Sequence, residues 1–343
     1  MIFFLVCYNV DEVIQNRRRC IKYMRKILIT GGLGQIGSEL TKKMRDIYGN
    51  DNVVMTDMQA KDTHKDLIES GPFEVLDILD REKMGEVVDR YKVDTIVNLA
   101  AILSAVGEAK PQLCYNVNMN GLYNVLELAR EKDLSVFTPS SIAVFGANTP
   151  KDKTPQDTIM RPGTMYGVTK VAGENLCDYY YHKFGVDTRG VRFPGLISND
   201  TLPGGGTTDY AVHIYYEALK QKKYTSFIDK GTKMDMMYMP DALNAIVQLL
   251  EADPSRLKHR NAFNITAMSF DPEDMAHSIR KHIPEFQLDY DVDPVRQAIA
   301  DSWPNSLDDS EARAQWDWNP EFLLEDMTAD MFQSLRKKLN IQD

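Results

Sequence analysis

Short apolar runs rich in β-forming residues alternate with longer amphipathic stretches through the first half of the chain. The apolar runs predict strands at residues 26–30, 52–57, 73–77, 95–100, 135–139 and 187–192. The stretches between them predict helices, one ending near residue 48 and others at 81–91, 113–131 and 165–184. Strands that alternate with helices of this length pair in parallel through crossovers. The pattern therefore predicts an α/β fold with a doubly wound parallel sheet.

A glycine-rich turn joins the first predicted strand to the first predicted helix. Gly31, Gly34 and Gly37 allow a tight turn, close approach of the backbone to a pyrophosphate, and close packing of the helix. Helix N–H groups and the positive end of the helix dipole would then face the phosphates. Asp57 ends the second strand about 20 residues later, where its carboxylate can bind both adenosine ribose hydroxyls and repel a 2′-phosphate. Together these features predict a Rossmann-type site for NAD rather than NADP.

Residues at other strand ends are predicted to extend this site. A carboxylate follows the third strand, where it could lie near the adenine amino group or simply be solvated. Small side chains follow the fourth strand, where the backbone of the cofactor must pass. Besides the three glycines and Asp57, the predicted cofactor contacts within the turn and at the strand ends are Gln35, Ile36, Asp77, Ile78, Leu99, Ala100 and Ala101.

The second half of the chain is less regular. A glycine-rich loop at 203–206 precedes a helical pattern from about 208 to 221, and Asp241 is expected to cap a helix at 242–251.

We expect a nucleotide-binding domain of residues 24–193 plus about 234–260. A smaller C-terminal substrate lobe would comprise about 194–233 plus 261–338. Residues 1–23 are predicted to be an appendage outside the fold, with a cleaved targeting segment as the alternative.

Tyr166 and Lys170 are four residues apart, so in a helix they share one face. A phenol is a poor base because its ordinary pKa is about 10, and a neighbouring ammonium lowers that pKa. Such a pair can take a proton from an alcohol near neutral pH. A hydroxyl of Ser140 or Ser141 would hold the substrate oxygen. Beside a complete nucleotide-binding turn, the pair predicts hydride transfer rather than two exposed side chains on a helix surface.

Composition and charge exclude several other classes of function. The 343 residues carry a formal net charge of -10 without a basic stripe, so we expect no binding to nucleic acid. No apolar run approaches the length of a membrane span, so we expect no membrane association. The four cysteines have the spacing of neither a disulfide framework nor a zinc site and indicate a reducing compartment. We therefore expect a cytoplasmic protein without a metal ion, with a mitochondrial protein as the alternative.

Four segments together resemble the extended short-chain dehydrogenase/reductase family. They are residues 30–37, 98–101, 140–146 and 166–170, and they occur in the family's order. Within that family, residues 202–211, 236–241 and 302–310 are similar to segments of the short-chain type of L-threonine 3-dehydrogenase. The likeness extends from about residue 26 to residue 338.

The resemblance implies NAD-dependent oxidation of L-threonine at C3 to 2-amino-3-oxobutanoate. It implies that Tyr166 is the base and that Lys170 lowers the pKa of Tyr166 and binds the nicotinamide ribose. Ser141 would hold the substrate oxygen, and although relatives often carry threonine there, either side chain supplies a hydroxyl. The resemblance also implies a homodimer that forms through helices 113–131 and 165–184.

Several candidate site residues keep two interpretations. Ser104, Thr207 and Thr208 are candidates to bind the ammonium and carboxylate of the amino acid, although either threonine could instead cap a helix. Asn118 could anchor a proton-relay water beside the cofactor or lie on a helix surface. Arg192 could bind the substrate carboxylate or form a structural ion pair.

Other functions would use some of the same residues. A nucleotide-sugar 4-epimerase has the same serine, tyrosine and lysine, and only the loop near residue 205 favours threonine over it. Relatives that are dehydratases carry an Asp-Glu pair after the active-site hydroxyl, where this chain has Ile142-Ala143. A catalytically silent sensor of NAD would usually lack the tyrosine or the lysine. Oxidation of threonine is therefore the favoured prediction, and the 4-epimerase is the alternative.

Overall fold

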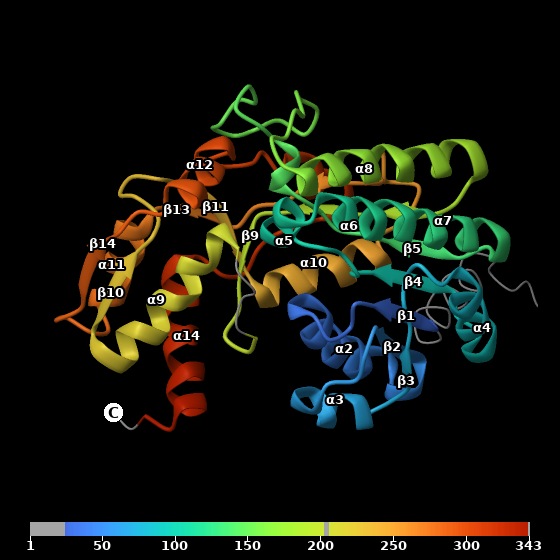
Figure 1. The fold of residues 1–343 in the computed structure, drawn as a ribbon, viewed down its shortest axis with the longest axis horizontal. Helices are drawn as coiled ribbons and strands as arrows, with labels where there is room; N and C mark the ends of the chain where they lie inside the picture. The colour runs from blue at the N-terminus through green and yellow to red at the C-terminus, as the bar shows by residue number, and fades with distance from the viewer. Residues whose placement is uncertain (1–24, 202–205, 342–343) are drawn as a thin grey trace, which may run out of the picture.

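A six-stranded parallel sheet lies at the centre of the computed structural model, which describes residues 25–201 and 206–341 (Figure 1). Its strands are β1 (Ile27–Thr30), β2 (Val53–Asp57), β3 (Phe73–Val75), β4 (Thr95–Asn98), β5 (Ser135–Phe137) and β7 (Thr188–Arg189). They are ordered β3-β2-β1-β4-β5-β7, and every neighbouring pair is parallel. The order reverses between β1 and β4, which is where sheets of this type bind ligands. The predicted doubly wound α/β fold is confirmed.

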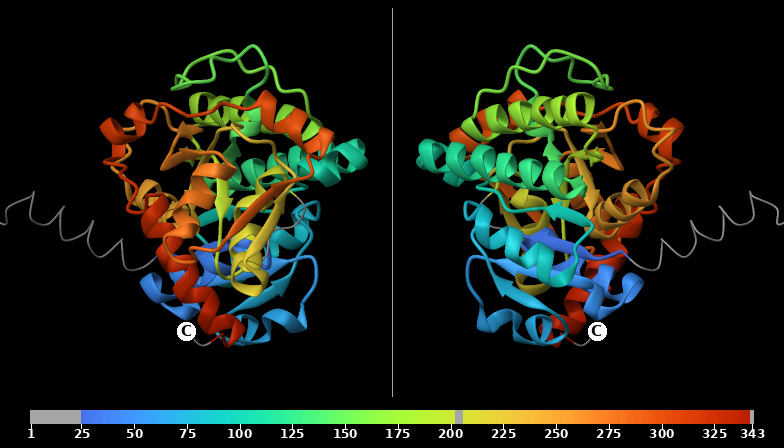
Figure 2. Two further views of the ribbon diagram at one scale, coloured as in Figure 1. Left: turned by 90° about the vertical axis from the view of Figure 1, so that its left-hand side faces the viewer. Right: turned by 90° about the vertical axis from the view of Figure 1, so that its right-hand side faces the viewer.

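Helices cover both faces of this sheet because the strands are apolar on both sides. The helices are α2 (Gln35–Tyr48), α3 (Lys65–Glu69), α4 (Arg81–Tyr91), α7 (Gly121–Lys132), α8 (Met165–Phe184) and α10 (Met239–Glu251). Ile27 and Ile29 of β1 are buried in a core cluster with residues of α2 and α10. Leu28 points the other way and packs with residues of α4 and α7. Figures 1 and 2 show α8 beside α7 on this second face.

The helix predicted at 113–131 is interrupted. The structure has α5 (Ser104–Ala109), α6 (Pro111–Tyr115), a π-helical turn at Asn116–Asn120, and then α7. Within the π-helical turn, the side chain of Asn118 accepts a hydrogen bond from the N–H of Ile102 at 2.8 Å. It donates to the Ile102 carbonyl at 3.1 Å and to the Thr169 hydroxyl at 3.0 Å. Asn118 is therefore a buried link between three segments, not a helix surface residue.

Gly190 divides the strand predicted at 187–192 into two strands that belong to different sheets. β7 ends at Arg189, and β8 (Val191–Phe193) pairs instead with β6 (Ser140–Ser141) and β12 (Phe263–Asn264). A Cβ atom at residue 190 would lie 2.4 Å from the carbonyl oxygen of Thr138. Only glycine allows the chain at residue 190 to pass this close to the backbone of Thr138. This close contact determines where the predicted strand is interrupted.

The C-terminal part builds a smaller lobe. Its strands are β9 (Gly195–Ile197), β10 (Lys223–Ser226), β11 (Met234–Tyr238), β13 (Met268–Phe270) and β14 (Gln287–Tyr290), and its helices are α9 (Tyr210–Gln221), α11 (Pro272–Arg280), α12 (Pro294–Ser302) and α14 (Leu324–Leu339). By contrast, α13 (Ser310–Trp316) packs in the same core cluster as β1 and α10. β11 pairs in parallel with β9 and antiparallel with β13. Tyr215, Tyr238 and Phe332 are buried in its core. The exact residue limits of the two domains stay a prediction.

Asp241 does not cap the helix that follows it, so that prediction was wrong. α10 begins at Met239, three residues earlier than expected, with Pro240 in its first turn. Proline fits there because the first N–H groups of a helix have no partner within the helix. The Asp241 carboxylate instead accepts hydrogen bonds from the N–H groups of Glu321 at 2.9 Å and Phe322 at 3.0 Å. It ties the C-terminal segment to α10.

The sequence predicts no membrane span, no metal site and no disulfide. Within 25–201 and 206–341, no helix is long and apolar enough to cross a membrane, and no group of three or more His, Cys, Asp or Glu side chains could hold a metal ion. Cys114 and Cys177 are buried free thiols. The predicted appendage at 1–23 and residues 203–205 of the glycine-rich loop lie outside the described residues.

The first turns of α2 are tied to the segment that leads into the glycine-rich loop. The Ser198 hydroxyl donates to Glu39 at 2.6 Å, and Lys42 pairs with Asp200 at 2.7 Å. Lys338 of α14 donates to the carbonyl of Asp200 at 2.5 Å. Burial raises the pKa of Glu39 to about 7; the hydrogen bond from Ser198 opposes this rise, and the charge of Asp200 adds to it.

Replacing Glu39 by glutamine should stabilise the protein at about pH 8 but not at about pH 5. Because the pKa of Glu39 is raised in the folded state, that state binds more protons than the unfolded chain between about 4.5 and about 7. Stability therefore falls as the pH rises through this window. Glutamine keeps an oxygen for Ser198 without the charge, so Tm at the higher pH should rise by roughly 2 °C.

Thermal melts at both pH values measure this effect. Glu86→Gln, on the exposed side of α4, is the matched control and should change Tm equally at both pH values. If Glu39→Gln changes Tm by the same amount at both pH values, the raised pKa of Glu39 is contradicted.

Candidate active site

The turn after β1 allows close approach of a phosphate group. Gly31 has a φ of +67°, which favours glycine. A Cβ atom at Gly37 would lie 2.3 Å from the Gly31 carbonyl oxygen, so α2 starts directly against the turn. Gly34 is the N-cap residue of α2 and supplies no side-chain hydrogen bond to the helix. The helix N-terminus therefore has the form that binds anions in dinucleotide sites.

Asp57 ends β2 beside this turn. One carboxylate oxygen accepts a hydrogen bond from the N–H of Leu33 at 3.0 Å, and the other accepts from the N–H of Met58 at 2.9 Å. These bonds fix the carboxylate next to the turn, and each oxygen keeps a further lone pair for a ribose hydroxyl. The turn and the carboxylate thus fit the adenosine half of NAD, and the negative charge would repel the 2′-phosphate of NADP.

One cavity of about 290 Å³ extends from the glycine turn to the smaller lobe. It is lined by residues of the turn, of α5 and α8, and of the segments after β6 and β8, together with part of the chain that enters α9. The predicted site residues that line it are Gly31, Gly34, Gln35, Ile36, Gly37, Leu99, Ala101, Ser104, Ser141, Tyr166, Lys170, Thr207 and Thr208. The fold therefore brings most of the predicted residues to one space.

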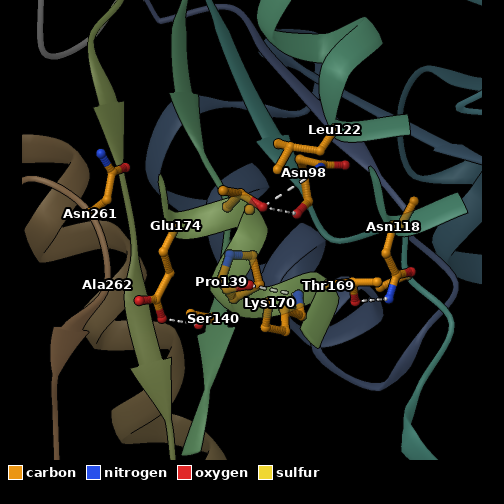
Figure 3. Close-up of a pocket in the computed structure, with 14 residues that line it drawn as sticks. Asn98, Asn118, Leu122, Pro139, Ser140, Thr169, Lys170, Glu174, Asn261 and Ala262 are labelled. Carbon is orange, nitrogen blue, oxygen red and sulfur yellow. Dashed lines mark hydrogen bonds between the residues drawn. The ribbon is translucent and has the colours of Figure 1, made fainter. Parts of the chain in front are cut away.

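A smaller cavity of about 30 Å³ adjoins the first, and Lys170 lines both (Figure 3). Ala100 and Asn118, predicted to contact the cofactor, line this smaller cavity. Asp77 and Ile78 line neither cavity. Asp77 accepts a hydrogen bond from the N–H two residues later, and Ile78 is buried against Gly121. Their contact with adenine stays a prediction.

The start of α8 brings Tyr166 against Ser141. Thr164 caps the helix by accepting a hydrogen bond from the N–H of Gly167 at 3.1 Å. A Cβ atom at Gly167 would lie 2.2 Å from the carbonyl oxygen of Ala143, so α8 touches the turn that follows Ser141. Burial raises the pKa of Tyr166 to about 12, and a hydrogen bond with Ser141 opposes this rise. The phenol is therefore neutral near pH 7 in the protein alone.

Lys170 lies one turn further along the same face of α8. Its ammonium donates a hydrogen bond to the carbonyl of Pro139 at 2.7 Å and lies 5.5 Å from the centre of the Tyr166 ring. Burial lowers the pKa of Lys170 to about 8, and the carboxylate of Glu174 opposes this fall. Burial thus shifts the pKa of Tyr166 and the pKa of Lys170 in opposite directions.

The two candidate threonines for the substrate precede α9. Thr207 and Thr208 belong to the 3-10 turn Thr207–Asp209, and Gly206 is the N-cap residue of this turn. The Asp209 carboxylate accepts a hydrogen bond from the N–H of Gly206 at 2.7 Å. Asp209 rather than either threonine therefore closes this turn, and the alternative in which a threonine caps the helix was wrong.

Trp303 also lines the large cavity, and sequence reasoning did not identify it as a site residue. It directly follows α12, and its side chain is 8% exposed. No local sequence pattern in residues 302–310 indicates a binding site. Only the resemblance of this segment to L-threonine 3-dehydrogenases drew attention to it. The position of Trp303 depends on how the lobe folds back onto the nucleotide-binding part.

Arg192 forms a structural ion pair, which excludes the alternative in which it binds the substrate. Its guanidinium contacts both carboxylate oxygens of Glu174, at 3.0 and 2.8 Å. It also donates to the carbonyl of Gln156 at 2.8 Å and to the side-chain oxygen of Asn264 at 3.0 Å. The side chain is buried, and its hydrogen-bonding groups are already used by these partners.

Comparison with known proteins identifies relatives over nearly the whole chain. The model of the NAD dependent epimerase/dehydratase family matches residues 27–266. The solved structure of an L-threonine dehydrogenase from Clostridium difficile is 63% identical, with a TM-score of 0.91, and the match covers 92% of this chain and 99% of that one. A monomeric L-threonine 3-dehydrogenase from a metagenome is 44% identical, with a TM-score of 0.86, 91% of this chain and 99% of that one being covered.

An uncharacterized epimerase/dehydratase from Staphylococcus haemolyticus is 56% identical over 315 residues, which are 92% of this chain and 99% of that protein. The family match spans more than half of the chain and includes the glycine turn, Asp57 and both residues of the Tyr166 and Lys170 pair. The cofactor is NAD, as the turn and Asp57 predict. The chain therefore belongs to the NAD dependent epimerase/dehydratase family and is an NAD-dependent oxidoreductase.

Proposed function

We propose that the protein oxidises L-threonine at C3 to 2-amino-3-oxobutanoate, with NAD as the hydride acceptor. The observation that carries the proposal is the single cavity that joins the glycine turn to Ser141, Tyr166 and the Thr207–Asp209 turn. This arrangement supports proton transfer by Tyr166 between the cofactor turn and the hydroxyls of Thr207 and Thr208. The 63% identity to a threonine dehydrogenase over almost the full chain supports threonine as the substrate.

Tyr166 would take the proton of the threonine side-chain hydroxyl in this mechanism. NAD held by the glycine turn, Asp57 and Lys170 would supply the acceptor for the hydride on C3 and a positive charge that favours the phenolate. Lys170, when protonated, favours the phenolate in the same way and binds the nicotinamide ribose. Ser141 donates a hydrogen bond to the substrate oxygen as the carbonyl forms.

The amino-acid end of the substrate would lie between α5 and the chain that enters α9. Ser104, Thr207 and Thr208 offer hydroxyls to the ammonium and carboxylate groups. Trp303 lines the same cavity and supplies an apolar surface for the methyl group of threonine. These side chains select a small polar substrate by hydrogen bonds and shape rather than by a single opposite charge.

The residues after Ser141 disfavour one class of nucleotide-sugar enzyme. Ile142 and Ala143 are each 2% exposed, so apolar core residues stand where dehydratases carry their acid and base. This observation supports oxidation of an alcohol over elimination of water, and the assay below separates threonine oxidation from the 4-epimerase reaction.

NADH formation from L-threonine and NAD tests this function, with epimerisation of UDP-galactose as the rival reaction. Tyr166→Phe should lower kcat by about 10³-fold because it removes the base. NAD affinity, measured by calorimetry, should change by less than about threefold, since the ring and Lys170 remain. Tyr91→Phe, at a tyrosine of α4 that lines neither cavity, is the control. Activity close to that of the wild type in Tyr166→Phe, or turnover of UDP-galactose alone, would exclude the mechanism.

Asp57→Asn tests the choice of cofactor. Removing the charge weakens two ribose hydrogen bonds and removes the repulsion of a 2′-phosphate, so kcat/KM with NAD should fall about tenfold relative to that with NADP. Steady-state kinetics with both cofactors measure this ratio. Asp66→Asn, an exposed acid of α3, should leave the ratio unchanged. An unchanged ratio in Asp57→Asn would mean that the carboxylate does not contact the ribose.

We also propose that two copies of the chain associate through the helices within 113–131 and 165–184. Large apolar side chains are exposed on α6, α7 and α8, namely Leu113, Tyr115, Tyr123, Val168, Tyr179 and Phe184. Tyr179 and Phe184 form an edge-to-face pair with ring centres 5.8 Å apart. Exposed large apolar side chains gathered on neighbouring helices are typical of an interface.

Light scattering should therefore give a mass near twice the 39.1 kDa of one chain. Val168→Glu places a charge within the exposed surface and should yield monomers, because an unpaired charge is costly in an interface. Ile159→Glu, which is exposed outside these helices, should leave the mass unchanged. A wild-type protein that stays at the mass of one chain, as one relative described as monomeric would, contradicts the dimer.

A further inference from the structure

Glu174 is a buried acid next to the catalytic residues, and the oxidation mechanism does not use it directly. It lies one helical turn after Lys170 and is 7% exposed. One carboxylate oxygen accepts hydrogen bonds from the Ser140 hydroxyl and from Arg192, and the other accepts from Arg192 at 2.8 Å. A buried carboxylate stays charged only with partners of this kind. Glu174 is thus a buried, ion-paired carboxylate inside the nucleotide-binding domain.

Two hydrogen bonds connect α8 to the strand that carries Ser141. The Lys170 ammonium donates to the carbonyl of Pro139 at 2.7 Å, and the hydroxyl of the next residue, Ser140, donates to Glu174 one turn along the helix (Figure 3). The residue after that is Ser141. Because the two bonds join the two residues before Ser141 to consecutive turns of the helix, they fix how α8 lies against the segment that carries Ser141.

Arg192 in turn holds Glu174 in place. Its guanidinium also binds the carbonyl of Gln156 and the side chain of Asn264, and it lies 5.3 Å from the centre of the Phe145 ring. Arg192 belongs to β8, so these contacts anchor its guanidinium beside the sheet formed by β6, β8 and β12. The carboxylate is therefore fixed by the fold and cannot follow a movement of α8 without losing its partners.

Glu174 also acts on Lys170 through its charge. Both residues line the smaller cavity, and interactions between charges are strong where little water is present. Burial lowers the pKa of Lys170, and Glu174 opposes this more than the thiols of Cys177 and Cys114 do. Without the carboxylate, the ammonium would lose its proton at a lower pH and could no longer favour the phenolate form of Tyr166.

We propose that Glu174 is a positioning residue for the Tyr166 and Lys170 pair, holding α8 in register with Ser141 and keeping the Lys170 ammonium charged. Its role in catalysis rests on the proposed function, whereas its effect on the charge of Lys170 does not. Glu174→Gln removes the negative charge but keeps an oxygen for the Ser140 hydroxyl. Ser140→Ala removes that hydrogen bond and keeps the charge.

Titration of Lys170 is the primary test. Lysine labelled with ¹³C at Cε gives one NMR signal for each side chain, and Lys170→Met identifies the signal of interest. In Glu174→Gln its midpoint should fall by about one pH unit. Ser140→Ala should leave the midpoint unchanged. Asp187→Asn, which breaks an ion pair with Arg189 elsewhere in the same domain, is the matched control and should also leave it unchanged.

Kinetics separate the two parts of the role. Glu174→Gln should lower kcat for threonine about tenfold, leave KM within about twofold, and move the loss of activity at high pH to lower pH. Ser140→Ala should lower kcat without moving the pH profile. Asp187→Asn should change neither quantity.

Each outcome decides the proposal. A Lys170 midpoint that is unchanged in Glu174→Gln overturns it, whether or not threonine is a substrate. If the wild type does not oxidise threonine, the proposed function fails, and a fallen midpoint still supports the action of Glu174 on Lys170. If circular dichroism reports that Glu174→Gln is unfolded, the double variant Glu174→Gln/Arg192→Met leaves no unpaired buried charge and carries the same expectation.

Discussion

The contact between the start of α8 and the turn after Ser141 is the constraint on which the active site depends. A side chain at Gly167 would collide with the carbonyl of Ala143, so glycine alone lets the helix pack this closely. That packing brings Tyr166 and Ser141 to the same cavity. It also brings the half-buried Lys170 side chain to the Pro139 carbonyl, two residues before Ser141. The proposed proton transfer therefore depends on the backbone of two neighbouring elements.

The parallel sheet decides where this contact meets the cofactor. The strand order reverses between β1 and β4, and the glycine turn and Asp57 lie at the carboxyl edge beside that point. The smaller lobe closes the same edge with Thr207, Thr208 and Trp303. In the proposed function, a substrate in the cavity would lie between groups that bind the cofactor and groups that recognise an amino acid. Burial raises the pKa of Tyr166 and lowers that of Lys170 there, and the charge of Glu174 opposes the fall at Lys170.

The sequence predicted the sheet, the glycine turn, Asp57 and the alternation of helices, because these depend on short-range periodicity and on residues with special backbone freedom. It did not predict contacts between residues far apart in the chain. The π-helical turn at Asn118 and the bonds of Asp241 to the C-terminal segment arise in this way, as does the choice of Glu174 as the partner in the ion pair that was one of two interpretations of Arg192. Trp303 enters the site only because the lobe folds back. The dimer and a cytoplasmic location stay predictions.

Direct hydride transfer from C3 of threonine to NAD is the central claim of this account. L-threonine that carries deuterium at C3 tests it, with the reduced cofactor analysed by mass spectrometry. The account predicts NADH that contains one deuterium for each molecule of threonine consumed, formed more slowly than from unlabelled threonine because the C–H bond breaks in the chemical step. NADH without deuterium, or consumption of threonine without NADH, would contradict it.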